Sequence, residues 1–223
     1  MSELLFDFQG NPKIEFIINN NDTVVVVLRE WLNHYYAINL HNELKNKLQW
    51  ISGKITLVNK TVDIPRKLFF LGDDDLKTYK YNKLSFPIES WNQDNDLYRE
   101  IKGICKKINE DEILNRITKN QLNFNSCSLN YYRDGMDKID PHSDKEAVGP
   151  LNAVVSVSLG DARHIIFRSK EKNIEGIREK IETTLNNSDL LIMFGECQNK
   201  WTHGIPREVG RGSRISLTFR IID

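Results

Sequence analysis

Three residues in the C-terminal half of the chain have the types and the spacing that a metal site requires. His142 and Asp144 are two positions apart, and His203 lies far downstream. In a β-strand, residues two apart project to the same face, so His142 and Asp144 can bind one ion while His203 approaches from a distant strand. Two histidines and one carboxylate leave positions on the metal open, which is typical of non-haem Fe(II) oxygenases and unlike the closed sites of structural zinc. The sequence therefore predicts an iron site whose open positions accept a chelating cosubstrate and O₂.

A second pattern with chemical meaning lies in the predicted strand 214–221. Its alternation separates a polar face from an apolar face, with Arg214, Ser216, Thr218 and Arg220 opposite Ile215, Leu217, Phe219 and Ile221. Burying guanidinium groups is unfavourable unless anions pair with them, and arginine binds carboxylates through two parallel hydrogen bonds. A dicarboxylate such as 2-oxoglutarate is therefore a natural partner, and Asn130 and Tyr132, which also share a face, are further candidate contacts. The alternative is an ordinary edge strand with solvated arginines.

Charge composition limits how the protein can bind nucleic acid. The 223-residue chain has 31 Lys and Arg against 31 Asp and Glu, so no global field attracts a polyanion. Any binding to nucleic acid must come from local patches. The candidates for phosphate contacts are Arg66, Lys67, Arg163, His164, Arg168, Lys170, Lys172, Arg207 and Arg211.

Cysteine content and hydropathy indicate the compartment. The three cysteines, Cys105, Cys127 and Cys197, have neither the even count of a disulfide framework nor the spacing of a zinc ribbon, so they are interpreted as reduced thiols. No basic start is followed by an apolar stretch, and no run reaches the ~18 apolar residues that span a bilayer. We expect a soluble intracellular protein without a membrane partner, with nucleus and cytoplasm left open.

The predicted elements form one α+β domain over residues 1–223. Two strands, Lys13–Asn19 and Thr23–Leu28, are interpreted as a packing appendage. Apolar residues recur at helical spacing in 33–50 and 96–108, which predicts two amphipathic helices. From Phe124 onward, short alternating runs predict an antiparallel β-sandwich, so about 1–123 is an N-terminal extension with a substrate lid and about 124–223 the catalytic core. The segments 51–91 and 170–188 are candidate substrate loops.

Several motifs in order resemble the AlkB family of nucleic-acid dealkylating dioxygenases. They are Asn130-Tyr131-Tyr132, the run from Pro141 to Glu146, Ser156-Val157-Ser158-Leu159-Gly160, the run from Trp201 to Pro206, and the run from Arg214 to Arg220. Upstream, Pro65-Arg66-Lys67, Gly72-Asp73 and Tyr79-Lys80-Tyr81 are similar to the substrate lid of the animal AlkB homologues two and three. The resemblance extends from about Leu40 to the C-terminus and implies a double-stranded β-helix, or jelly-roll, core with the two helices packed on its major sheet.

The resemblance also implies a role for each matched residue. His142, Asp144 and His203 match the Fe(II) ligands, and the implied 2-oxoglutarate contacts are Asn130, Tyr132, Arg214, Thr218 and Arg220. On the substrate side, Glu146 matches an acidic residue that faces the target base and Tyr81 an aromatic that stacks on it. Leu57-Val58-Asn59 takes the place of a finger that wedges into the base stack, although Val58 replaces its central aromatic. The remaining implied substrate residues are Arg66, Tyr79, Arg163 and Arg168. Two departures from family members are Gly204 and Ser216, neither of which removes a metal ligand.

Oxidative demethylation of 1-methyladenine and 3-methylcytosine in DNA is the activity that the resemblance implies, with 2-oxoglutarate and O₂ consumed and formaldehyde released. Extracting a base from its stack costs least when the base is damaged or single-stranded, so a single-stranded substrate fits this expectation. One alternative keeps the chemistry but acts on RNA or a protein side chain. Another is a binding module that recognises alkylated nucleic acid without catalysis. In each case we expect a monomer.

Overall fold

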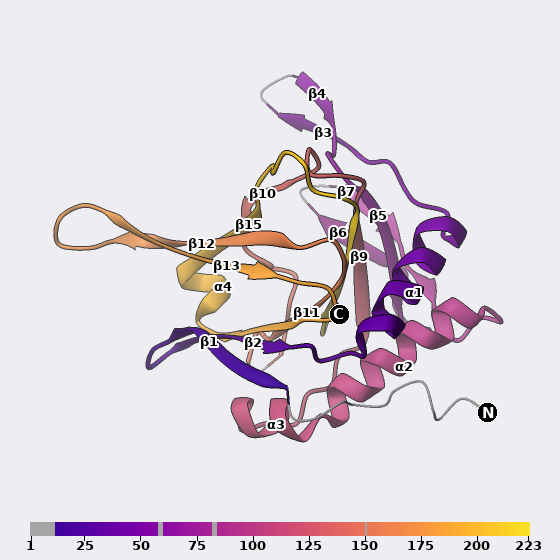
Figure 1. The fold of residues 1–223 in the computed structure, drawn as a ribbon, viewed down its shortest axis with the longest axis horizontal. Coiled ribbons are helices and arrows are strands. Elements are labelled where there is room, and N and C mark those ends of the chain that lie inside the picture. Colours follow the sequence, from indigo (N-terminus) through magenta and orange to yellow (C-terminus); the bar gives the residue numbers. More distant parts are fainter. Residues whose placement is uncertain (1–11, 58–59, 82–83, 150) are drawn as a thin grey trace.

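The computed structural model describes residues 12–57, 60–81, 84–149 and 151–223. Its framework is a pair of facing β-sheets, of eight and four strands (Figure 1). The major sheet has the order β1-β2-β14-β11-β16-β9-β5-β8 and the minor sheet the order β10-β15-β12-β13. Within the described ranges, no helix is long and apolar enough to cross a membrane.

The major sheet is antiparallel except where β8 joins its end. Its strands are β1 (Lys13–Asn19), β2 (Thr23–Arg29), β14 (Leu190–Gly195), β11 (Val154–Gly160), β16 (Arg214–Arg220), β9 (Ser126–Tyr132), β5 (Lys67–Gly72) and β8 (Glu89–Ser90). The minor sheet contains β10 (Ile139–His142), β15 (Trp201–Ile205), β12 (Arg163–Lys172) and β13 (Arg178–Leu185). Two hairpins stand apart from both sheets, β3 (Lys54–Leu57) with β4 (Lys60–Asp63), and β6 (Thr78–Tyr81) with β7 (Leu84–Pro87).

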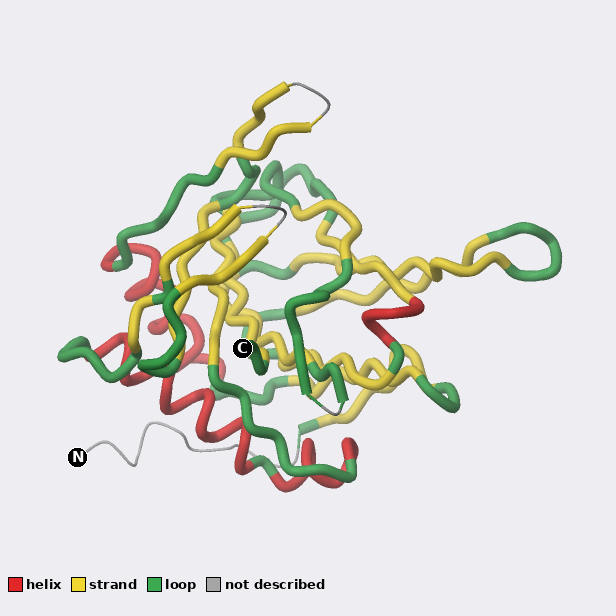
Figure 2. Tube along the Cα trace, turned by 180° about the vertical axis from the view of Figure 1, so that it is seen from behind, coloured by secondary structure: helices red, strands yellow, loops and turns green. Residues whose placement is uncertain are grey.

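Helices cover the outer face of the major sheet, and the minor sheet packs on its inner face (Figures 1 and 2). The helices on the outer face are α1 (His34–Lys47), α2 (Asp96–Glu110) and α3 (Glu112–Thr118), whereas the short α4 (Cys197–Lys200) contributes Cys197 to the cluster between the sheets. Strand β2 shows why both faces can be buried: Val26 and Leu28 belong to the cluster beneath the helices, while Val25 and Val27 belong to the cluster between the sheets. A strand buried on both faces reads as a continuous apolar run.

The predicted fold class is confirmed, because the chain combines helices with a two-sheet jelly-roll core and α1 and α2 pack on the major sheet. The helices α3 and α4 were not predicted. The first two strands are not an appendage, since β2 pairs with β14 and makes the sheet edge with β1. Segment 51–91 is not a simple loop either, because it supplies β5 to the major sheet and forms both small hairpins.

The segment 170–188 is mostly strand rather than loop. Strands β12 and β13 pair from Arg163 with Leu185 out to Lys172 with Arg178, and their far end projects from the body of the molecule (Figure 1). Side chains on both faces of this projecting end are exposed, so the sequence shows no apolar alternation there. The absence of that pattern explains why strand was not predicted.

Candidate active site

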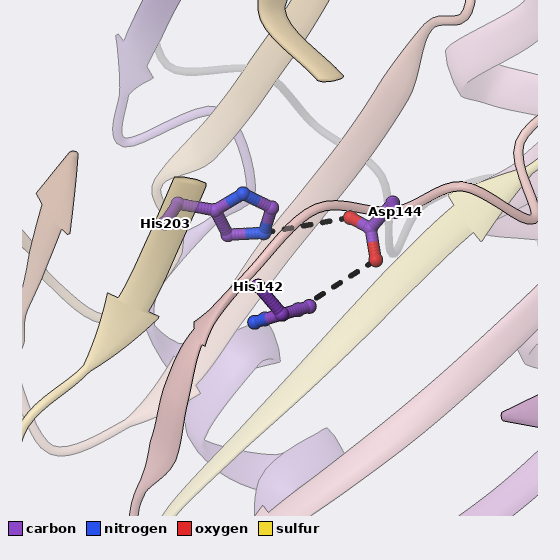
Figure 3. A group of neighbouring side chains, drawn as sticks. All are labelled: His142, Asp144 and His203. Carbon is purple, nitrogen blue, oxygen red and sulfur yellow. Dashed lines mark ion pairs between the residues drawn. The ribbon is translucent and has the colours of Figure 1, made fainter. Parts of the chain in front are cut away.

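Two histidines face each other across neighbouring strands of the minor sheet. His142 ends β10 and pairs in register with His203 of β15, and their ring centroids lie 4.5 Å apart. Asp144 completes the group, with its Oδ1 3.7 Å from His142 Nε2 and its Oδ2 3.4 Å from His203 Nε2 (Figure 3). The candidate ligand atoms of these three residues all lie within 4.8 Å of one another. The structure thus brings together the three residues predicted to hold iron, here called the His–Asp–His group.

Asp144 reaches this position from a loop, which corrects the expectation that it occupies a rung of the same strand as His142. Strand β10 ends at His142, and the loop that follows is tied to the α4–β15 region by two hydrogen bonds. The backbone N–H of Asp144 donates to Gln198 Oε1 at 2.9 Å, and the Ser143 hydroxyl donates to the Trp201 carbonyl at 2.8 Å. These contacts fix the carboxylate beside the histidines.

The protonation states of His142 and Asp144 suit a divalent cation. His142 Nδ1 lies 2.9 Å from the Asp140 carbonyl, so it donates there and leaves Nε2 as a ligand atom. Burial, aided by the neighbouring His203, lowers the pKa of His142 to about 4, so the ring is neutral at neutral pH. Burial alone would raise the pKa of Asp144, but the Arg220 guanidinium and the histidines hold it well below its ordinary value. Asp144 Oδ2 is buried without a hydrogen-bond partner among the described residues, as expected of an oxygen that awaits a metal.

A cavity lies between the sheets beside this group. Its empty space, including solvent at its opening, is about 680 Å³. The cavity is lined by Arg66, Leu68, Phe70, Tyr79, Ser128, Asn130, Tyr132, Ile139, His142, Asp144, Ser156, Ile165, Leu185, Leu191, Met193, His203, Ile205, Arg214, Ser216, Thr218 and Arg220. The whole predicted polar face of β16 therefore points into it, as do Asn130 and Tyr132 of β9.

Arg214 is a buried cation without a carboxylate partner in the described part of the chain. Its side chain is 1% exposed, and its Nη2 donates to Ser158 Oγ at 2.9 Å. Nε and Nη1 are buried with no hydrogen-bond partner among the described residues. Burial lowers the pKa of this guanidinium, because the charged form has lost its water. An incoming carboxylate would satisfy both nitrogens, so the cavity fits an acidic ligand.

Arg220 has a different environment from Arg214. Its Nη2 donates to Asp144 Oδ1 at 2.7 Å and its Nη1 donates to Ser128 Oγ. The pKa of Arg220 is raised despite burial, chiefly by Asp144. Its guanidinium is thus mainly the partner of Asp144, a contact that the strand pattern did not reveal. The neighbouring Thr218 lines the cavity and lies near Ser156, with 3.5 Å between the two hydroxyl oxygens.

Two residues predicted for the substrate lid contribute to the cavity wall. Tyr79 is buried and stacks on Phe70 with ring centroids 4.7 Å apart, while Arg220 lies over its ring at 5.8 Å. Arg66 is also buried and donates from Nε to Asn130 Oδ1 at 2.7 Å. Arg66 therefore lies in the cavity wall, joined to Asn130, rather than on the surface.

Other predicted substrate residues lie nearer the outside. Glu146 is half-buried close to Asp144, and burial raises the pKa of its carboxyl. Arg168 is exposed on β12. Tyr81 ends β6 and Leu57 ends β3, while the finger residues Val58 and Asn59 lie outside the described residues.

Arg163 is a correction to the phosphate-contact prediction. Its side chain is 0% exposed, and its guanidinium donates to backbone carbonyls and to Glu208. A fully buried guanidinium cannot meet a phosphate on the surface. A sequence pattern reports the charge of a residue but not whether loops close over it.

Ser128, Ser156 and Gln198 were not predicted as site residues. Ser128 shares the cavity-facing side of β9 with Asn130, so the two-residue rule that identified Asn130 could have found it. Ser156 lies on β11, where mostly apolar neighbours hide the inward polar position. Gln198 lies in the short α4, and nothing in its local sequence indicates that it holds Asp144.

Comparisons with known proteins agree with this geometry. The 2OG-Fe(II) oxygenase superfamily model matches residues 24–220. The chain is 28% identical over 194 residues to the mouse (Mus musculus) "DNA oxidative demethylase ALKBH2", covering 83% of this chain and 75% of that protein. It is 37% identical over 105 residues to the mouse "Alpha-ketoglutarate-dependent dioxygenase alkB homolog 3", covering 44% of this chain and 37% of that protein.

A solved structure shows the same fold. The structure of OsALKBH1 superposes with a TM-score of 0.54 at 21% sequence identity, covering 88% of this chain and 97% of that one. The predicted resemblance to AlkB proteins is confirmed by these relatives. Fe(II), 2-oxoglutarate and O₂ are the requirements of the matching family, and the His–Asp–His group fits them. The chain belongs to the 2OG-Fe(II) oxygenase superfamily.

Proposed function

We propose that this oxygenase removes N-methyl groups from alkylated bases in DNA, of the 1-methyladenine and 3-methylcytosine type. The observation that carries the proposal is the His–Asp–His group on the wall of a cavity that also holds Arg214, whose Nε and Nη1 have no hydrogen-bond partner among the described residues. The names of the relatives, which include DNA oxidative demethylases, support DNA as the substrate.

In this proposal, His142, Asp144 and His203 hold Fe(II), and Arg214 binds a carboxylate of 2-oxoglutarate. Asn130, Tyr132, Thr218 and Arg220 line the same cavity and are proposed to contact the cosubstrate, and Arg220 also orients the Asp144 carboxylate. When bound with O₂, iron and 2-oxoglutarate supply the oxidising power that hydroxylates an N-methyl group, after which the base is released with formaldehyde. The protein's own contribution is to fix the Asp144 carboxylate and to keep the His142 imidazole neutral.

The base-binding side is proposed to be the mouth of the cavity. Tyr79 lies in its wall, and the half-buried Glu146 follows the Asp144 loop. Tyr81 and the finger Leu57-Val58-Asn59 are proposed to contact the flipped base and the stack it leaves. Exposed Arg168 is proposed to contact phosphate. We also propose that the protein acts as a monomer inside the cell, which light scattering after size-exclusion chromatography would test for the oligomeric state.

The test is an assay for succinate and formaldehyde after anaerobic loading with Fe(II). Matched single-stranded and duplex DNA oligonucleotides carry 1-methyladenine, and His203→Ala is the control. We expect both products with the wild type and a loss of at least about 100-fold in the variant, because removing a metal ligand abolishes the iron site rather than weakening one contact.

Each other result has a defined meaning. Succinate without formaldehyde would retain the oxygenase but contradict methylated DNA as its substrate, and RNA and peptide substrates would then be assayed. Neither product from an iron-loaded protein that still binds the methylated strand would support a non-catalytic binding module. Equal formaldehyde from wild type and His203→Ala would contradict the assigned metal site.

A further inference from the structure

Arg163 is buried at a junction of loops outside the cavity. It is the first residue of β12, and its guanidinium donates to the carbonyls of Asp134 at 3.2 Å, Asp137 at 2.8 Å and Pro206. Its Nε also lies 3.3 Å from Glu208 Oε1. Four acceptors around one buried guanidinium indicate a built structural position.

These contacts join two connections that lead to the cosubstrate side of the cavity. Segment 133–138 follows β9, which ends at Tyr132, and segment 206–213 precedes β16, which begins at Arg214. The connections also bond to each other, since Glu208 N–H donates to the Gly135 carbonyl at 2.7 Å. Arg163 therefore anchors the end of one cavity strand and the start of another.

The ring of Tyr132 connects Arg163 to the cavity. The guanidinium carbon of Arg163 lies over this ring at 5.5 Å from its centroid, and that of Arg214 lies over it at 5.4 Å. A cation over a desolvated aromatic face is attracted by the ring, so both arginines help to fix its position. A shift of Arg163 would move the ring against which Arg214 rests.

Glu208 explains how two arginines tolerate this proximity. Its carboxylate accepts from Arg163 Nε and also from the backbone N–H of His164 at 2.8 Å, which holds it in place. Arg163 thus has a carboxylate partner within the protein, which it shares with Arg211. Arg214 has no carboxylate within ion-pair distance among the described residues, so its charge is left for a ligand.

We propose that Arg163, held by Glu208, is a positioning residue for the cosubstrate: it sets Tyr132 and Arg214 so that the free Arg214 nitrogens meet a carboxylate of 2-oxoglutarate. This inference rests on the proposed function, because it takes 2-oxoglutarate as the ligand of the cavity. Arg163 itself touches neither metal nor substrate.

The test measures 2-oxoglutarate binding by calorimetry to the full-length protein loaded with Mn(II). Arg163→Met and the charge-conserving Arg163→Lys are compared with Arg178→Met, an exposed arginine on the paired strand β13. We expect Arg163→Met to weaken 2-oxoglutarate binding at least about tenfold while the Mn(II) affinity stays within about twofold. Loss of a contact that supports a site residue typically lowers affinity or activity ~10–100-fold. Arg163→Lys should be intermediate because one ammonium cannot serve four acceptors. Arg178→Met should match the wild type.

A merely structural role would lower the melting temperature but leave 2-oxoglutarate affinity and its KM unchanged well below that temperature, and this result would overturn the inference. If Arg163→Met does not fold, Arg163→Lys and Glu208→Gln decide the matter by the same measurement. In active protein, the expected signature is a raised KM for 2-oxoglutarate with a smaller change in kcat. A wild-type protein that binds Mn(II) but not 2-oxoglutarate would instead contradict the proposed function, so the two failures are distinguishable.

Discussion

At the residue scale, the candidate metal site depends on side chains that do not belong to its ligands. Asp144 is held through its carboxylate by Arg220 and through its backbone by Gln198. Gln198 is 5% exposed and lies on α4, directly before the strand that carries His203. One amide side chain therefore couples the loop of one ligand to the strand of another.

Replacing Gln198 with leucine should weaken metal binding while leaving the three ligands in place. The Asp144 N–H would lose its acceptor, so the loop would hold the carboxylate less firmly, and a loss of about 10-fold in Mn(II) affinity is expected. Electron paramagnetic resonance titration of free Mn(II) measures it. Asn199→Leu, on the same helix, is the matched control. Equal affinities for wild type and Gln198→Leu would show that the loop positions Asp144 without this hydrogen bond.

The sequence is most informative where chemistry requires fixed spacing. The sequence alone identified His142, Asp144, His203 and the polar face of β16. Metal-binding residue types and the two-residue alternation of a strand can both be recognised without a structure. The role of Gln198 was not predicted, because its hydrogen bond joins segments that are far apart in the chain. Arg163 was misinterpreted because a charged residue beside others suggests a surface patch, although burial is decided by which loops pack over it.

At the element scale, α1 docks on the end of the major sheet through a histidine. His41 is 7% exposed, with its Nε2 3.2 Å from Ser213 Oγ, just before β16, and its Nδ1 3.4 Å from Asn42 Oδ1. Burial lowers the pKa of His41, and nearby Lys45 lowers it further. The helix therefore packs against the sheet with a neutral imidazole.

Acidification should consequently weaken this packing. The unfolded chain takes up a proton at His41 near its ordinary pKa of 6.5, while the folded protein resists protonation until a lower pH. Below about pH 6.5 the unfolded state binds more protons, so the free energy of unfolding that His41 contributes decreases as the pH is lowered. Urea unfolding of wild type and His41→Gln at pH 8 and pH 5 should show a wild-type advantage that shrinks on acidification.

The comparison cancels all groups that titrate alike in both proteins. His34→Gln, which replaces an exposed histidine on the same helix, is the control variant and is measured in the same way. A wild-type advantage over His41→Gln that is constant or grows toward pH 5 would contradict the assignment of a neutral buried imidazole.

Helices and strands were predictable where burial of one face gives apolar residues a periodic spacing in the sequence. Helix α2 was recognised because Leu97, Ile101, Ile104 and Ile108 lie along its buried face, and Asn95 caps its start by accepting from Leu97 N–H and Tyr98 N–H. Strands β1 and β2 were located correctly, but their position at the edge of the major sheet was not predicted. The sequence of a strand does not show which strand it pairs with. The projecting end of β12 and β13 lacked a pattern because neither face is buried.

At the scale of the whole molecule, zero net charge means that nucleic-acid binding cannot come from a general electrostatic field. Each phosphate contacted by a cation contributes about −0.9 to the slope of log K against log salt for duplex DNA. Local cations on the face that binds DNA should therefore account for the slope one by one.

Arg168→Ala should reduce the magnitude of the salt slope by about 1 while weakening binding of all sequences alike. Fluorescence anisotropy of methylated oligonucleotides with the Mn(II)-loaded protein at several salt concentrations measures the slope. Arg116→Ala, an exposed arginine on α3, is the control and should leave it unchanged. An unchanged slope in Arg168→Ala would remove this residue from the phosphate contacts.

The ion pair between Arg220 and Asp144 also has a mechanical meaning. Arg220 belongs to the major sheet, whereas Asp144 follows a strand of the minor sheet. This ion pair therefore links the two halves of the sandwich. The candidate metal ligands lie on the minor-sheet side, and the Arg214 guanidinium lies on the major-sheet side. A metal and a chelating carboxylate bound together would form a second link between the two halves, beside the ion pair. The bonds that prepare the reaction would then be the same bonds that keep the two halves of the protein closed.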